Sequence, residues 1–118
     1  MILVDTSVWV GHLRRDNARM RALLHGGEVL THPFVVGELA CGDVPNRTGM
    51  LQDVRALPEA TVAEHEEVLH LVESAKLYRR GIGWVDAHLL ASALISRCGL
   101  WTLDRRLLAA AKSLGVAL

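Results

Sequence analysis

The chain has 118 residues, of which 51% are hydrophobic and 22% charged, so it can bury one core and is not a disordered polymer. Thirteen basic and 13 acidic residues give a net charge of +0, which excludes the strongly basic balance of many nucleic-acid binders but leaves room for local patches. We expect one globular domain over residues 1–118.

The amino terminus predicts no export and no membrane association. Met1 leads directly into an apolar segment without a basic region or cleavage site, and no apolar run approaches the length of a membrane span. We therefore expect a cytoplasmic protein. The two cysteines, Cys41 and Cys98, have no metal-ligand spacing, and we expect both to be buried, reduced thiols.

The first element is an apolar run, residues 2–4, that leads into Asp5, Thr6 and Ser7. Such a run predicts a short strand buried on both faces, as in a parallel sheet. Asp, Thr and Ser end strands and cap helices. Because ligands of open α/β sheets bind at the carboxyl ends of the strands, Asp5 is either a helix cap or a functional acid.

Two helices are predicted next, one around residues 8–13 and one from Asp16, as its N-cap, to His25. Glycines 26 and 27 end the second helix. The arginines of this region are explained either by a solvated helix face or by contact with a nucleic-acid backbone.

A short strand is predicted at residues 28–31, and a helix at residues 33–41 capped by Thr31 or His32. Within this helix, Glu38 lies among apolar neighbours, and Gly37 costs roughly 1 kcal/mol relative to alanine. Either the helix packs closely on a neighbour with Glu38 aimed inward, or Glu38 lies on an exposed edge.

Residues 43–60 are the least informative part of the chain, and the helix predicted after them shows the apolar spacing of core packing. The pattern predicts a helix at residues 47–56, a weak strand near residues 60–61 and a longer helix to about Arg79. Thr61 and Glu64 have the spacing of a capping box at the start of that helix.

Asp86 opens the next apolar helix, where the helix dipole alone could account for a carboxylate. His88 falls on a different face, so we expect a surface histidine or one beside the site, not a ligand. Residues 99–104 then repeat the opening pattern, with a short apolar strand that ends at Asp104. A helix and a final edge strand at residues 115–118 complete an α/β fold with a short parallel sheet and helices on both faces.

Four acids stand out: Asp5, Glu38, Asp86 and Asp104. If they converge, two carboxylates about 4 Å apart repel by roughly 4 kcal/mol at an effective dielectric near 20. Protons or a cation must then neutralise the cluster. An all-oxygen site suits Mg²⁺ or Mn²⁺, which can activate water for attack on a phosphodiester.

These motifs, in their order, resemble the PIN-domain proteins of the VapC toxin family over essentially the full chain. They read Val-Asp5-Thr6-Ser7, Glu38-Leu39, Asp86-Ala-His-Leu-Leu-Ala and Leu-Trp-Thr102-Leu-Asp104-Arg-Arg-Leu. The resemblance implies a three-layer α/β/α PIN fold and a Mg²⁺- or Mn²⁺-dependent endoribonuclease that leaves a 5′-phosphate. It makes the four acids the metal ligands and catalytic residues, with Thr6, Ser7 and Thr102 supporting them.

The resemblance also implies partners. These are an RNA substrate, a second copy of the chain in a homodimer, and a VapB-like antitoxin that covers the acidic site. Some relatives carry a further acid or an aromatic residue after the last motif, where this chain has two arginines, so the number of metal ions stays open. In a neutral chain, RNA contacts must come from local arginines: Arg14, Arg15, Arg79, Arg80, Arg105 and Arg106.

Two rival functions remain. One is a binding module that keeps the PIN fold without its chemistry. The other is a phosphatase of the haloacid-dehalogenase kind, which requires a second Asp two residues after the first acid, where this chain has Ser7. We expect Trp9 and Trp101 to be partly buried, although Trp9 could instead line a partner groove.

Overall fold

The computed structural model describes all residues, 1–118, and is built on a three-stranded parallel sheet. The strands are β1 (Ile2–Val4), β2 (Val29–Leu30) and β3 (Gly99–Trp101), in the order β2-β1-β3. Leu3 pairs with Leu30 on one side and with Leu100 on the other, and all three side chains are buried. The predicted central strand at residues 2–4 is therefore confirmed, and so is the parallel sheet.

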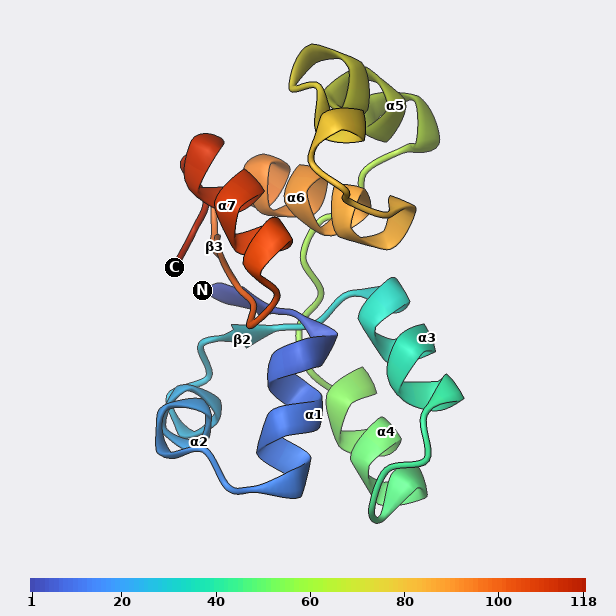
Figure 1. The fold of residues 1–118 in the computed structure, drawn as a ribbon. Helices are drawn as coiled ribbons and strands as arrows, with labels where there is room; N and C mark the ends of the chain where they lie inside the picture. The colour runs from blue at the N-terminus through green and yellow to red at the C-terminus, as the bar shows by residue number, and fades with distance from the viewer.

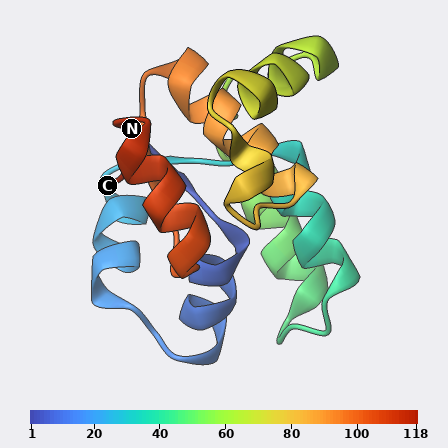
Figure 2. The ribbon, with the colours of Figure 1, turned by 45° about the horizontal axis from the view of Figure 1, so that its top comes forward.

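Helices cover both faces of this sheet, which confirms the predicted three-layer α/β/α architecture. In Figure 1, α1 to α4 lie below the strands and α5 to α7 above them. Figure 2 places the two termini side by side, because β1 pairs with β3 and Ala117 pairs with Leu100. The helices are α1 (Thr6–Arg14), α2 (Ala18–His25), α3 (Pro33–Cys41), α4 (Arg47–Arg55), α5 (His65–Ser74), the short 3₁₀ helix η1 (Leu77–Arg79), α6 (Trp84–Ser96) and α7 (Arg105–Ser113).

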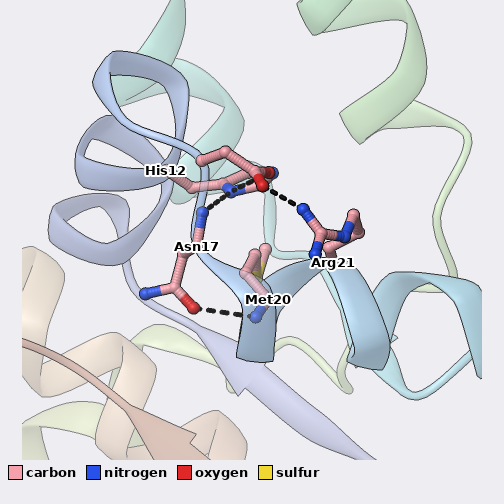
Figure 3. Close-up of polar contacts among 5 residues, drawn as sticks. His12, Asn17, Met20 and Arg21 are labelled. Carbon is pink, nitrogen blue, oxygen red and sulfur yellow. Dashed lines mark hydrogen bonds and ion pairs between the residues drawn. The ribbon is translucent and has the colours of Figure 1, made fainter.

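The start of α2 differs from the prediction by one residue. Asn17, not Asp16, is the N-cap, and its Oδ1 accepts a hydrogen bond from the Met20 N–H at 3.0 Å. Asp16 instead pairs with Arg21, while the Asn17 N–H donates to His12 Nδ1 at 3.0 Å (Figure 3). The turn between α1 and α2 is thus held by side chains from both helices.

The predicted long helix to Arg79 is wrong at both ends. Its capping box is formed by Glu64 and Glu67, where the Glu64 N–H donates to Glu67 Oε1 at 2.9 Å, and does not involve Thr61. The helix ends at Ser74 because Lys76 adopts a left-handed conformation, with φ of 52°, which breaks the helical hydrogen-bond ladder.

Two predicted strands are single bridges. Near residues 60–61 the pairing is limited to Thr31 with Glu59, and at the carboxyl terminus to Leu100 with Ala117. Each bridge is made by a pair of backbone hydrogen bonds, such as that from the Leu100 N–H to the Val116 carbonyl at 2.7 Å. The pairing does not continue beyond these bonds. In both cases the segment touches the sheet edge over too short a length to form a strand.

The tryptophans and cysteines differ in burial. Trp9 is buried in the core and Trp101 is half-buried, with the Arg19 guanidinium 5.0 Å from its ring. Cys98 is buried, but Cys41 is exposed at the end of α3, so the prediction of two buried thiols is wrong for Cys41; both are free. None of the helices is long and apolar enough to cross a membrane.

Candidate functional site

The carboxyl ends of β1 and β3 place Asp5 beside Thr102. Asp5 is buried, and its N–H donates to the Trp101 carbonyl at 2.9 Å. Its Oδ2 accepts two hydrogen bonds of 2.7 Å, one from Ser7 Oγ and one from Thr102 Oγ1. Asp5 occupies the N-cap position of α1, but its side chain makes no capping bond, so the capping interpretation fails for the carboxylate.

The two hydroxyls hold the loop after β3 as well as Asp5. Ser7 Oγ accepts from the Leu103 N–H at 3.0 Å, and Thr102 Oγ1 accepts from the Asp104 N–H at 3.0 Å. Each hydroxyl has one hydrogen, which it donates to Asp5, and its lone pairs receive the backbone. Oδ2 of Asp5 is therefore committed to two donors, and Oδ1 accepts no hydrogen bond from the protein.

Asp104 is the N-cap of α7 and also belongs to the acidic cluster. Its Oδ1 accepts from the Arg106 and Leu107 N–H groups at 2.9 and 3.1 Å, as a capping carboxylate does. Its Oδ2 accepts no hydrogen bond from the protein, and the side chain is exposed. One oxygen thus fixes the carboxylate while the other remains available to a ligand.

Glu38 is exposed on α3, so the exposed-edge alternative holds and the inward-aimed one is wrong. A Cβ added at Gly37 would meet nothing within 4 Å, so α3 does not pack closely on a neighbour there. Glu38 is nevertheless tied to the start of α1, because Thr6 Oγ1 donates to Glu38 Oε1 at 2.7 Å. Thr6 is the residue that directly follows Asp5.

Asp86 lies in the first turn of α6, whose N-cap is Gly83, and is half-buried. Its pKa is raised to about 6, first by burial and then by the negative charges of Asp5, Asp104 and Glu38. Four carboxylates from four separate elements therefore lie within electrostatic reach of one another.

No basic side chain neutralises this cluster. Both ion pairs of the structure belong to Asp16, on the turn between α1 and α2. The four acids offer an all-oxygen donor set and uncompensated negative charge, which fit Mg²⁺ or Mn²⁺. However, no three acidic, histidine or cysteine side chains converge tightly enough to coordinate an ion in this structure. Closing a coordination shell therefore requires these carboxylates to approach one another more closely than they do here.

The six predicted RNA-contacting arginines are all exposed but do not form one surface. Arg14 and Arg15 lie at the far end of α1 from Asp5, a separation of roughly 13 Å along the helix axis. Arg105 and Arg106 begin α7, and Arg106 packs against Gly81, where an added Cβ would lie 3.0 Å from its Nη1. Arg79 and Arg80 precede that glycine, so these four are the arginines nearer the acids.

An aromatic cluster beneath the first turn of α6 was not predicted. His88 is buried, so the surface interpretation is wrong, and its ring packs edge-on against Phe34 at 4.5 Å and Trp84 at 4.9 Å. Trp84, His88 and Ser92 are spaced at i, i+4 and i+8, which is the sequence signal that could have revealed their shared helix face.

His32 joins this cluster from the start of α3. Its Nδ1 accepts the Phe34 N–H at 3.0 Å, so Nε2 carries the hydrogen and donates to Ser92 Oγ at 3.1 Å. Burial, with a smaller effect from His88, lowers the pKa of His32 to about 4. The prediction that Thr31 or His32 caps α3 is confirmed for His32. The neutral imidazole thus connects α3 to α6, the helices that carry Glu38 and Asp86.

Comparison with known proteins finds a matching family and a matching fold. The family model described as PIN domain matches residues 2–113. Ribonuclease VapC32 of Mycobacterium tuberculosis, from strains CDC 1551 / Oshkosh and ATCC 25618 / H37Rv, is 49% identical over 87 residues, which cover 74% of this chain and 70% of the relative. The crystal structure of PAE2754 from Pyrobaculum aerophilum superposes with a TM-score of 0.61 at 21% identity, covering 92% of this chain and 78% of that one, and supports the fold.

Proposed function

The chain belongs to the PIN-domain family, in its VapC branch, and from this premise we propose that it is a divalent-metal-dependent endoribonuclease toxin. Its substrate is RNA, and its product carries a 5′-phosphate. The proposal rests on the family and on the chemistry of the acidic cluster together, because fold alone does not establish an activity.

The observation that carries the proposal is the environment of Asp86. Asp86 is half-buried, shares its surroundings with three further acids and has no basic partner. Its burial and then these charges raise its pKa. Such an arrangement is unfavourable unless a proton or a cation joins it, and above about pH 6 the proton is lost. A structural role would be served better by neutral side chains, so a ligand of positive charge accounts best for the four acids.

Each acid has a defined part in this proposal. Asp5 is the fixed ligand, because two hydroxyls orient its carboxylate and leave Oδ1 free. Asp104 offers Oδ2 while its Oδ1 caps α7. Asp86, on α6, and Glu38, on α3, supply the remaining negative charge of the metal site. A bound Mg²⁺ or Mn²⁺ supplies an activated water and neutralises charge on the scissile phosphate.

The supporting hydroxyls act by orientation. Thr102 and Ser7 hold Asp5, and Thr6 holds Glu38. Because each of the three hydroxyls donates its hydrogen to a carboxylate, we assign these residues positioning roles and no proton transfer. Our candidates for contacts with the RNA backbone are the arginines near the acids: Arg79, Arg80, Arg105 and Arg106. Arg14 and Arg15 lie farther from the acids and would contact only a longer RNA.

We further propose that the protein is held inactive by a VapB-like antitoxin and acts as a homodimer in the cytoplasm. The support for these partners is the family relationship. If the protein were instead a binding module without catalysis, its function would not depend on the four acids. The phosphatase is disfavoured because Ser7 stands where its second Asp is needed.

The test is RNA cleavage by the purified protein with Mg²⁺ or Mn²⁺. We expect cleavage that chelation abolishes and that Asp5→Asn reduces by several orders of magnitude. Asp16→Asn is the matched control, because Asp16 is an exposed acid on the turn between α1 and α2. Equal cleavage by Asp5→Asn and the wild type would reject the proposal; binding of RNA without cleavage would favour the module.

A further inference from the structure

An open groove runs along α3 and the first turn of α6, directly beside the acidic cluster. Its volume is 570 Å³, and it is shallow and open to solvent. We call it the α3–α6 groove; it is lined by Phe34, Gly37, Glu38, Cys41, Trp84 and Val85, with Pro33 at one end. None of the residues that line the groove belongs to the hydrophobic core, and only Glu38 belongs to the proposed metal ligands.

The walls of the groove are aromatic and apolar. Trp84 is 38% exposed, an unusual position for so large a side chain, and Phe34 is half-buried on the facing helix. Trp84 is held in place by His88 at 4.9 Å and His65 at 5.1 Å between ring centroids. An exposed tryptophan supported by other rings is a rigid platform with its remaining surface open to a partner.

The charges of the groove decide what can enter it. Its single charged residue is Glu38, and no basic side chain lines it. A phosphate would be repelled there, whereas an uncharged planar base would be accepted on the aromatic walls. Glu38 could also accept a hydrogen bond from a base amino group, as carboxylates do from cytosine.

The groove is continuous with the acidic cluster through Glu38, which belongs to both. Asp86 lies in the same first turn of α6 as Trp84, on another face of the helix. A nucleotide whose phosphate lies at the acids therefore has a neighbouring base within reach of Trp84. This continuity favours an RNA base over an unrelated small molecule.

We propose that the α3–α6 groove binds one unpaired base of the RNA substrate, stacked against Trp84 and Phe34 next to the scissile phosphate. This inference rests on the proposed ribonuclease function. It gives the enzyme a requirement for single-stranded RNA at the cleavage site, because a base within a duplex cannot enter the groove.

The direct test is a titration followed by nuclear magnetic resonance of the tryptophan indole N–H groups. The chain has three tryptophans, and Trp84→Phe identifies the Trp84 signal. Adenosine monophosphate is a suitable probe, because it carries a base and has no phosphodiester to cleave; ribose 5-phosphate is the control without a base. With Mg²⁺ present, we expect millimolar adenosine monophosphate to shift the Trp84 signal and ribose 5-phosphate to leave it in place.

A matched pair of variants at Gly37 tests the groove without altering the aromatic cluster. Gly37 lines the groove, and nothing lies within 4 Å of an added Cβ, so the fold accepts alanine without a clash, while the longer leucine side chain extends from that open position into the groove. Gly37→Leu fills the groove and should abolish the shift of the Trp84 signal, while Gly37→Ala keeps it. In RNA cleavage, Gly37→Leu should raise KM about tenfold relative to Gly37→Ala, as expected for a lost stacking contact.

The outcomes separate the two proposals. Normal RNA cleavage by Gly37→Leu, or equal shifts with both probes, overturns the base site and leaves the ribonuclease standing. No cleavage of any RNA, with a Trp84 signal that still responds to the base, rejects the ribonuclease alone. A Trp84 signal that changes with protein concentration instead of nucleotide assigns the groove to a second copy of the chain and overturns the base site.

Discussion

Thr102 donates a hydrogen bond of 2.7 Å to Oδ2 of Asp5, joining the ends of β1 and β3 across 97 positions of sequence. The same hydroxyl receives the Asp104 N–H, so one side chain orients two of the four acids. Thr102 is buried, and its two bonds are sheltered from water. Its removal therefore affects both stability and the geometry of the acids.

Thr102→Val tests this link, because valine keeps the shape of threonine and removes its hydroxyl. We expect the free energy of unfolding to fall by about 1–3 kcal/mol, since a buried carboxylate loses a donor and the Asp104 N–H loses an acceptor. Thr102→Ser keeps both bonds and is the control. Urea unfolding measures the difference, and equal losses in both variants would show that packing, not the hydroxyl, is responsible.

Asp104 offers a test that separates its cap from its charge. Asp104→Asn keeps an oxygen for the Arg106 and Leu107 N–H groups and removes negative charge, so we expect thermal stability without metal to be kept or raised. Asp104→Ala loses the cap and should cost about 1 kcal/mol. A larger loss from asparagine than from alanine would contradict a capping role; thermal melts in chelator measure both.

Asp5→Asn tests whether the four acids form one metal site. In chelator we expect its melting temperature to equal or exceed that of the wild type, because one repelling charge is removed. Mn²⁺ should raise the melting temperature of the wild type by several degrees and that of the variant very little. The idea of a shared site fails if Mn²⁺ stabilises both proteins equally.

The raised pKa of Asp86 predicts a specific dependence of stability on pH. The folded protein keeps this proton up to about pH 6, whereas the unfolded chain releases it near 3.8, so stability from this group falls as pH rises through that window. His32 acts in the opposite direction, because its pKa of about 4 lies below the ordinary 6.5, and its contribution is lost as pH falls through 6.5 towards 4.

Asp86→Asn separates these two opposing effects. Without the Asp86 contribution, the metal-free variant should gain stability more steeply than the wild type between about pH 4 and 6. Urea unfolding at several pH values, with chelator present, gives both slopes. Parallel curves would mean that Asp86 titrates normally and that the four acids do not interact.

Gly37→Ala predicts a simple gain in stability. Gly37 lies within α3, and an added methyl group meets no neighbour, so the variant should gain about 0.5–1 kcal/mol from helix propensity alone. Thermal or urea unfolding measures this change. A loss of stability would reveal a contact of α3 that the structure does not contain.

The local pattern of apolar residues was enough to predict the strands that frame the site. The apolar runs before Asp5 and Thr102 predicted β1 and β3, because strands buried on both faces leave an unbroken hydrophobic signature. The alternation of strands and helices predicted the parallel sheet. Predictions failed where a single backbone angle or a near-equivalent cap decided the outcome, as at Lys76 and at Asn17.

The amino-acid sequence by itself determined the order of the strands and helices and the four acids, since periodicity and motif spacing are properties of the chain. Only the tertiary structure decided that Asp5 is bound by Thr102 and Ser7 and does not cap its helix, and that Glu38 is exposed while His88 is buried. The reason is that burial of a helix face depends on which distant segment packs against it, and a hydrogen bond across 97 residues leaves no local trace.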